Sequence, residues 1–316
     1  MRGKVNFEEA FELPTLAESS RTQASKFIAP ADLDRYMEHI KDPTGARLQE
    51  ATDRGIGYTI YSHTVPGVQG ISDKREAEEH ARRGNDWIAS EIRDYRERVG
   101  AFAALSMHDP AQAAGELERC VKMYGFHGAL VNNFQHAGED GETYLFYDQP
   151  DYDVFWTKCV ELDVPVYLHP SAPTGRYYEQ MYAQRKYLVG PPLSFAKRRL
   201  PAPFRPNNKR REHIPFDFWW INHWLQDVER LLAEKNGDFM CKRDIYHYFK
   251  RNIWVTTSGH FSTEAVAFRI SAGCGWFDGE EESLIEALGG EDRYMMVGRE
   301  NAKRLFGLGK YPDCDA

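Results

Sequence analysis

Short apolar segments that alternate with longer amphipathic ones are the feature that most constrains how this chain can fold. The apolar segments are 4–8, 57–61, 101–105, 128–132, 164–169 and 252–258. Most are apolar at successive positions, which is typical of parallel strands that are buried on both faces. Their alternation with helices predicts an α/β fold and favours a (β/α)8 barrel over a sandwich.

The amphipathic stretches predict helices at 75–98, 110–124 and 152–162. The second of these has clear signals at both ends, because Asp109 is an N-cap residue, Pro110 suits a first turn and Gly125 suits a C-terminal stop. A doubly wound open sheet is the structural alternative. No glycine-rich phosphate loop follows the first apolar segment, so the nucleotide-binding form of that fold is disfavoured.

Composition and charge exclude several classes of function. The formal net charge of −8 argues against a general nucleic-acid binder. No window reaches the roughly 18 apolar residues of a membrane-spanning helix, and the first residues lack the pattern of a secretory signal. The scattered cysteines, with no CxxC pair, indicate reduced thiols. We therefore expect a cytoplasmic protein with neither nucleic acid nor membrane as a partner.

Polar residues at the ends of the apolar segments are the candidates for chemistry, because the active site of a barrel lies at the carboxyl ends of its strands. Glu8 ends the first segment and His169 ends the fifth. A carboxylate and an imidazole are ordinary ligands for a divalent ion such as Zn²⁺. From spacing alone, the simpler interpretation is favoured: Glu8 caps a helix and His169 is a hydrogen-bonded core residue.

The other histidines carry weaker signals. His63 follows the second segment and could reach the same pocket, and His260 follows a later strand and could serve as a stray ligand. Six further histidines lack metal-type spacing and are expected at the surface or in packing: His39, His80, His127, His136, His223 and His247.

A resemblance to a known family runs along nearly the whole chain. The opening segment 1–14, MRGKVNFEEAFELP, carries it first. Further matching segments follow in order at 57–62, 100–110, 147–150, 167–170, 189–196, 254–259, 273–276 and 301–306. The chain resembles the salicylate, 2,3-dihydroxybenzoate and γ-resorcylate decarboxylases of the amidohydrolase superfamily, and most of all the salicylate enzymes. The resemblance implies one (β/α)8 barrel domain over 1–316.

The resemblance also implies a site and a reaction. Glu8 and His169 would hold one divalent metal ion, usually zinc. Ala10 stands where some relatives have a histidine ligand, and with Phe195 it would line the substrate pocket. A small aromatic hydroxy acid such as salicylate or 2,3-dihydroxybenzoate would lose CO₂ without oxidation, oriented by the metal. Relatives assemble as homo-oligomers, so a dimer or a tetramer is expected.

Two departures from the family pattern concern the catalytic residues. The family's sixth strand ends in Gly-His-x-Gly-Glu, but here 197–212 holds seven basic residues and three prolines. If Glu212 is the catalytic glutamate of that motif, Lys209 stands where its histidine is expected. The family's eighth strand, with the aspartate that binds metal and donates the proton, is absent between 268–272 and 273–276. Trp220 replaces a common arginine. The sequence thus predicts a barrel without the sixth and eighth strands.

These departures leave three interpretations of function open. The chain is an active decarboxylase, or it is a catalytically dead product of a faulty gene model or a pseudoenzyme, or it is a metal-dependent hydrolase of the same superfamily. The basic run at 197–212 also has the form of a nuclear-import or nucleic-acid patch. Such a run more often marks a solvated segment, so that interpretation is disfavoured.

Overall fold

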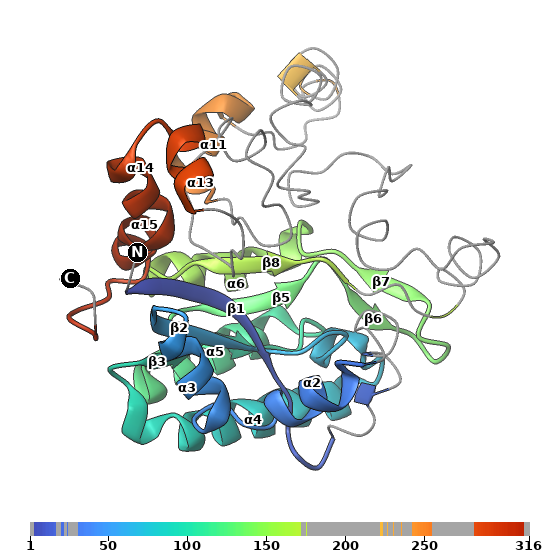
Figure 1. Ribbon diagram of the computed structural model, residues 1–316. Coiled ribbons are helices and arrows are strands. Elements are labelled where there is room, and N and C mark those ends of the chain that lie inside the picture. The colour runs from blue at the N-terminus through green and yellow to red at the C-terminus, as the bar shows by residue number, and fades with distance from the viewer. Residues whose placement is uncertain are drawn as a thin grey trace, which may run out of the picture.

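A computed structural model of the chain contains a curved parallel sheet with helices along one face (Figure 1). The structure describes residues 3–16, 20–21, 24, 31–171, 175, 222–223, 226, 230, 235, 242–254 and 281–312. The parallel strands are β1 (Lys4–Phe11), β2 (Ile56–His63), β3 (Val99–Ala101), β4 (Ala103–Ala104), β5 (Ala129–Asn132) and β8 (Val166–His169). β3 pairs with β2, and β4 pairs with β5. Phe102, which lies between β3 and β4 in the chain, donates its N–H to the carbonyl of Tyr61 in β2 at 2.8 Å. The strand order therefore follows the chain from β1 to β8.

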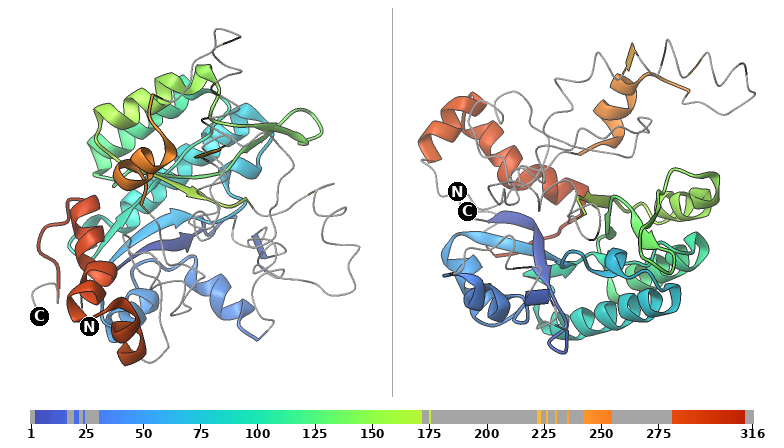
Figure 2. Two further views of the ribbon diagram at one scale, coloured as in Figure 1. Left: turned by 90° about the horizontal axis from the view of Figure 1, so that it is seen from above. Right: turned by 90° about the vertical axis from the view of Figure 1, so that its right-hand side faces the viewer.

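Helices connect the strands and cover the outer face of the sheet. They are α2 (Leu33–His39), α3 (Ala46–Asp53), α4 (Lys74–Glu91), α5 (Pro110–Tyr124) and α6 (Asp153–Glu161). An antiparallel hairpin, β6 (Gln135–Ala137) with β7 (Thr143–Leu145), precedes α6. Short 3₁₀ turns lie at Val68–Gly70, Arg93–Tyr95 and Pro150–Tyr152. Figure 2 shows α4 and α5 on the outer side of the curve and the C-terminal helices on the other side.

The C-terminal part of the described chain is helical. It comprises α11 (Ile245–Asn252), α13 (Glu281–Leu288), α14 (Glu291–Met295), the π-helical segment Met296–Glu300 and α15 (Asn301–Leu305). Its last residues return to the start of the sheet, where the Tyr311 hydroxyl donates to the carbonyl of Gly3 at 3.1 Å. No helix among the residues that the structure describes is long and apolar enough to cross a membrane.

Local sequence signals set the ends of the helices. The Asp109 carboxylate accepts the N–H groups of Ala111 and Gln112 at 3.0 and 3.2 Å, and Gly125 ends α5 with a left-handed φ of 67°. The helix predicted at 110–124 is confirmed. The helix predicted at 75–98 is shorter than expected, because α4 ends at Glu91 and a 3₁₀ turn follows it.

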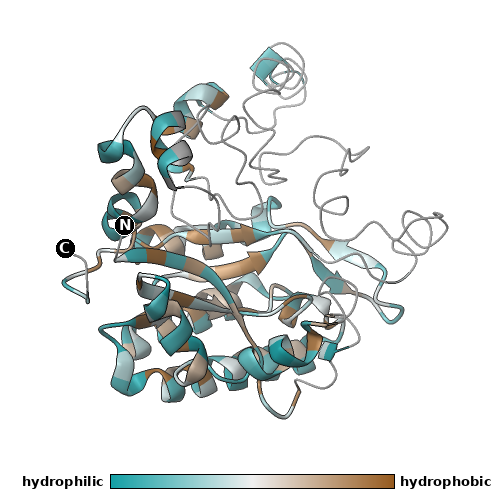
Figure 3. Ribbon diagram, viewed as in Figure 1, coloured by the Kyte–Doolittle hydropathy of each residue, from teal (hydrophilic) through white to brown (hydrophobic). Residues whose placement is uncertain are grey.

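The strands separate two apolar clusters, as expected for a sheet buried on both faces. The outer cluster joins strand residues to the helices and includes Phe11, Tyr61, Val131, Ile88, Leu117 and Phe155. The inner cluster contains Val5, Phe7, Tyr58, Ile60, Phe102, Leu130, Tyr167, Ala302 and Tyr311. Figure 3 shows the apolar colouring concentrated on the strands and the polar colouring on the outward sides of the helices.

Strand β1 contains a β-bulge that changes which face its side chains join. Asn6 pairs with Thr59 and Glu9 with Tyr61, so β1 uses one more residue than β2 between these pairs. Phe7 belongs to the inner cluster and Phe11, of the same parity, to the outer cluster. A bulge has this effect because its extra residue reverses the alternation of side chains. The bulge therefore directs Glu8 to the same inner face as Phe7.

The sequence-based expectations for the fold are met in part. The α/β class is confirmed, and the sequential order of neighbouring strands differs from the orders of doubly wound sheets. The strand predicted at 252–258 is wrong at its start, because Asn252 ends helix α11 and Ile253 and Trp254 are not in a strand. The residues after Trp254 in that segment lie outside the described ones. So do 197–212 and 268–274, where the family strands were expected to be missing.

Candidate functional site

Glu8 and His169, here called the inner-face pair, converge from the first and last of the described parallel strands. Oε1 of Glu8 lies 3.3 Å from Nε2 of His169. The Tyr167 hydroxyl donates to the other oxygen of the Glu8 carboxylate, Oε2. Nδ1 of His169 lies 2.8 Å from the carbonyl oxygen of Pro170. Because a carbonyl can only accept, this contact places the proton on Nδ1 and leaves the Nε2 lone pair facing Glu8 when the ring is neutral.

The convergence of the inner-face pair follows from the curvature of the sheet. β1 and β8 do not pair with each other, yet the rings of Phe7 and Tyr167 lie 6.1 Å apart. The sheet therefore bends so far that its two end strands face each other across the inner cluster. Both side chains are only partly buried, with 16% of His169 and 23% of Glu8 exposed.

Two neighbours complete the inner face at this end of the strands. Ala10 lies two residues after Glu8 and pairs with Ser62, and its methyl group offers no ligand atom. Asn132 pairs with His169 in register, so both side chains leave the same face of the sheet. Nδ2 of Asn132 donates to the Pro66 carbonyl at 3.1 Å, whereas its buried Oδ1 has no hydrogen-bond partner among the described residues. That oxygen is therefore an unused hydrogen-bond acceptor within the described part of the chain.

A second set of ligand-type side chains, here called the outer-face triad, consists of Glu12, His63 and His80. Glu12 follows β1, His63 ends β2 and His80 lies on α4. Nε2 of His63 lies 3.3 Å from Oε1 of Glu12 and 3.0 Å from Nε2 of His80. Glu12 and His63 are buried and His80 is half-buried. The three donor atoms all lie within 4.8 Å of one another.

Electrostatics within the outer-face triad are strongly coupled. Burial would raise the pKa of the Glu12 carboxyl, but the charge and hydrogen bond of His63 outweigh it and lower the pKa to about 2. Burial opposes protonation of His63, yet Glu12 raises the pKa of that ring. For His80, burial first and the charge of His63 second lower the pKa to about 4. His80 is therefore a neutral imidazole at pH 7.

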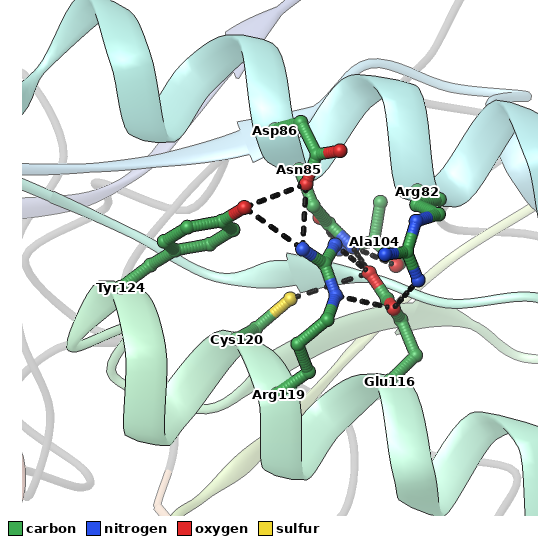
Figure 4. Close-up of polar contacts among 8 residues, drawn as sticks. All are labelled: Arg82, Asn85, Asp86, Ala104, Glu116, Arg119, Cys120 and Tyr124. Atoms are coloured by element: carbon green, nitrogen blue, oxygen red, sulfur yellow. Dashed lines mark hydrogen bonds and ion pairs between the residues drawn. The ribbon is translucent and has the colours of Figure 1, made fainter.

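A buried polar network, shown in Figure 4, is structural. The buried Glu116 carboxylate accepts from Nδ2 of Asn85 at 2.8 Å and from Nη2 of Arg119 at 2.6 Å. Asn85 also pairs with the backbone of Ala104, donating at 2.9 Å and accepting at 2.8 Å. Arg119 reaches Asp86 at 2.6 Å. Because these groups bond to one another, the network ties α4, α5 and β4 together.

The structure places the sequence-predicted site residues unevenly. It brings Glu8 and His169 together and sets Ala10 beside them. Phe195 and Glu212 lie outside the described residues, as do Lys209, Trp220 and His260. His63 does not face the inner-face pair but packs against Phe11 of the outer cluster, with ring centroids 5.3 Å apart.

Glu12 and His80 had no signal in the sequence that marked them. The ends of neighbouring strands adjoin one another, and this could have paired Glu12 with His63. Nothing in the spacing places His80 of α4 beside them.

Comparison with known proteins is consistent along the chain. The family model described as amidohydrolase matches residues 28–218. The γ-resorcylate decarboxylase of Rhizobium sp. (strain MTP-10005) is 36% identical over 98% of this chain and 99% of its own length.

Solved structures agree with these matches. A crystal structure of 2,6-dihydroxybenzoate decarboxylase complexed with 2,6-dihydroxybenzoate has a TM-score of 0.75 and 32% identity, covering 98% of this chain and 100% of that one. A dihydroxybenzoic acid decarboxylase from Polaromonas sp. JS666, with bound manganese and 2-nitroresorcinol, also has a TM-score of 0.75, with 30% identity and 98% of both chains covered.

Proposed function

We propose, on the premise that this chain belongs to the amidohydrolase family and is a carboxy-lyase of its decarboxylase group, that it removes CO₂ from an ortho-hydroxybenzoate. The observation that carries the proposal is the 3.3 Å approach of Glu8 to His169 at the inner face. In barrel enzymes, ligands bind at the carboxyl ends of the strands, where His169 lies. The Rhizobium relative and the 2,6-dihydroxybenzoate decarboxylase named above act on one compound, because γ-resorcylate is 2,6-dihydroxybenzoate. 2,3-Dihydroxybenzoate and salicylate are further candidates.

The inner-face pair fits a divalent metal ion. It offers one carboxylate oxygen and one imidazole nitrogen, a donor combination common to zinc and manganese sites. The metal, when bound, would act as a Lewis acid that holds the carboxylate and ortho hydroxyl of the substrate. Zinc is the metal predicted from the sequence. Because the Polaromonas relative holds manganese, we propose only a divalent ion here, with its identity left to metal analysis.

The surrounding residues have defined tasks in this proposal. Tyr167 holds one oxygen of Glu8, and the Pro170 carbonyl fixes the ring of His169, so both donor atoms are oriented before a ligand arrives. The free Oδ1 of Asn132 is suited to accept a hydrogen bond from a substrate hydroxyl. Phe195 as a pocket residue and Glu212 as a catalytic residue remain proposals from the family resemblance.

The reaction needs a proton but no redox partner. Protonation of the ring carbon that bears the carboxylate lets the bond to that carboxylate break. Its electron pair returns to the ring, and the carboxylate leaves as CO₂. No electrons pass to or from a cofactor. The family's proton donor is an aspartate, and no Asp occurs between Asp244 and Asp278 in this chain.

That missing aspartate favours a second candidate, a catalytically dead product of a faulty gene model or a pseudoenzyme. Lys209 also favours this candidate, because it stands three residues before Glu212, where the family has a histidine. The alignment with the Rhizobium enzyme runs over 344 positions, more than the 316 residues of this chain. Some positions of the relative therefore have no counterpart here. Sequencing the messenger RNA across codons 196–213 and 268–274 tests this candidate directly, since restored segments would reveal a different natural protein.

Assays of the purified chain separate the candidates. The protein is loaded with Zn²⁺ or Mn²⁺ and incubated with 2,6-dihydroxybenzoate, 2,3-dihydroxybenzoate and salicylate, and the phenolic product and CO₂ are quantified. Release of both supports the decarboxylase. A folded, metal-loaded protein without turnover supports the inactive candidate. Turnover of an amide or ester without CO₂ release would instead favour the hydrolase of the same superfamily.

A dimer or tetramer is proposed from the family resemblance and is checked by light scattering on the purified protein. A cytoplasmic location is proposed from the composition and is checked by cell fractionation.

A further inference from the structure

The outer-face triad is a built cluster of metal-ligating side chains away from the inner-face pair. It joins the segment after β1, the end of β2 and the middle of α4 through Glu12, His63 and His80. None of the three belongs to the site proposed for the decarboxylase. We propose that these residues hold a second divalent transition-metal ion, of the class of Zn²⁺, that ties the strand ends to helix α4.

The spacing of the donor atoms fits one ion. A tetrahedral site with bonds of about 2.0 Å has donor atoms roughly 3.3 Å apart. The distance of 3.3 Å between Oε1 of Glu12 and Nε2 of His63 matches this separation. The distance of 3.0 Å between Nε2 of His63 and Nε2 of His80 is a few tenths of an ångström shorter. The third distance is within 4.8 Å, so a small movement of the half-buried His80 closes the set. Two imidazoles and one carboxylate form a donor set that zinc uses with its fourth position open.

The facing atoms of the outer-face triad need either a proton or a metal ion between them. Nδ1 of His63 lies 3.2 Å from the carbonyl oxygen of Thr64, which can only accept a hydrogen bond. The neutral His63 ring therefore points an Nε2 lone pair at the Glu12 carboxylate, which is also rich in lone pairs. Two such groups, both buried, repel each other unless a proton or a metal ion lies between them. A metal ion additionally satisfies Nε2 of His80.

The groups behind the ligands are those of a metal site. The Thr64 carbonyl fixes the His63 ring, as carbonyls do for metal-binding histidines. The Glu12 carboxylate accepts the Leu13 N–H at 2.8 Å and the Ser20 hydroxyl at 2.8 Å. The first of these bonds is to Oε1, the oxygen that faces His63, and the second is to Oε2, so together they fix the orientation of the carboxylate. The ligands are thus oriented before the ion arrives, which raises affinity.

The outer-face triad is separate from the inner-face pair. His63 packs on the ring of Phe11 at 5.3 Å, and Phe11 belongs to the outer cluster. The ring of His63 also lies over Gly84 of α4, where an added Cβ would be 3.2 Å from its Cδ2. Glu8, by contrast, contacts Tyr167 of the inner cluster. The sheet itself lies between the two sites, so each can be removed without the other.

The chemistry of the donors selects the ion. Imidazole nitrogen binds Zn²⁺ more strongly than Mn²⁺ or Mg²⁺, and two of the three donors are imidazoles. Binding the folded state alone stabilises it by mass action. The ion would therefore connect α4 to the ends of β1 and β2 and raise the temperature of unfolding.

The test uses the full chain with the inner-face pair removed by Glu8→Gln and His169→Gln. The protein is stripped with a chelator, loaded with Zn²⁺, desalted and analysed for metal per chain and for thermal unfolding. We expect about one zinc ion per chain and a rise in melting temperature. Adding His80→Leu should lower the zinc content about tenfold or more and abolish the rise. His39→Leu is the control, because His39 lies on α2 and is not part of the outer-face triad. It should change neither the zinc content nor the rise in melting temperature.

Two results overturn the proposal. One is that the protein without the inner-face pair retains no zinc, and the other is that His80→Leu leaves its zinc content unchanged. If the His80→Leu protein fails to fold, crystals of the unsubstituted protein soaked in Zn²⁺ decide. An anomalous-scattering peak between Nε2 of His63 and Nε2 of His80 supports the site. Absence of that peak rejects it.

Discussion

Nε2 of His169 lies 3.3 Å from Oε1 of Glu8, although their strands do not pair with each other. The contact exists because the sheet curls until its first and last described strands face each other. It exists also because a bulge in β1 turns Glu8 to the inner face. An acidic and an imidazole donor at this separation leave room for one cation between them.

The first prediction concerns the metal at the inner-face pair. Glu8→Gln and His169→Gln should each remove about one equivalent of metal per chain, because a metal site with so few protein donors does not survive the loss of one. Metal analysis after desalting measures this. Glu9→Gln is the matched control, since the neighbouring Glu9 pairs with Arg47 instead. Equal losses in the Glu8 and Glu9 variants would contradict the assignment.

The second prediction concerns the start of β5, where Gly128 passes against the backbone of Pro165. A Cβ at Gly128 would lie 2.1 Å from the Pro165 carbonyl oxygen, and φ is +135°. Gly128→Ala should therefore lower the free energy of unfolding by about 3 kcal/mol or more. Gly115→Ala, in helix α5 with open space around it, should instead raise it by about 0.5–1 kcal/mol. Urea unfolding compares them, and similar effects of the two changes would contradict the close approach.

The third prediction concerns the network of Figure 4. Glu116→Ala should cost about 3–5 kcal/mol, because it leaves Arg119 and Asn85 without their shared acceptor in a buried place. Glu118→Ala on the same helix removes a solvent-exposed ion pair with Lys122, and should have a much smaller effect on the free energy of unfolding. Chemical denaturation of both variants gives the comparison. A small effect at Glu116 would mean that the network contributes little to stability.

Much of the fold could be predicted because its signals are local. Asp109, Pro110 and Gly125 define a helix through their own conformational preferences, and 110–124 forms it. The segments 128–132 and 164–169 form strands because they are apolar over a strand's length. The strand predicted at 252–258 was wrong at Asn252, which is helical. A short apolar run of that length fits either a strand or a buried helix.

The functional residues were harder to predict because they depend on distant contacts. Alternation alone would place Glu8 on the face opposite Phe7, and only the bulge, which is a property of pairing with β2, puts both on one face. His80 looked like a packing residue because its partners Glu12 and His63 come from other elements. A sequence pattern does not encode such contacts until the register of the strands and the rotation of α4 are known.

The last prediction concerns the pH dependence of stability at His127, whose Nε2 lies 2.9 Å from the Tyr58 hydroxyl. Burial lowers the pKa of His127 to about 4, against a weaker opposing effect of a hydrogen bond to the Phe306 backbone. The unfolded chain keeps a value near 6.5. Above pH 6.5 the ring is neutral in both states, so its contribution to stability is complete. As the pH falls from 6.5 towards 4, the unfolded state binds the proton first and this stability is lost, by roughly 3 kcal/mol.

His127→Gln isolates this effect, because glutamine keeps a polar group near Tyr58 but does not titrate. The free energy of unfolding of both proteins is measured by urea denaturation at pH 7.5, 6, 5 and 4. The unsubstituted protein should lose about 3 kcal/mol more than the variant across this range. Parallel curves would mean that His127 takes up its proton equally in the folded and unfolded states. In that case, burial beside Tyr58 would not oppose the charge as the geometry requires.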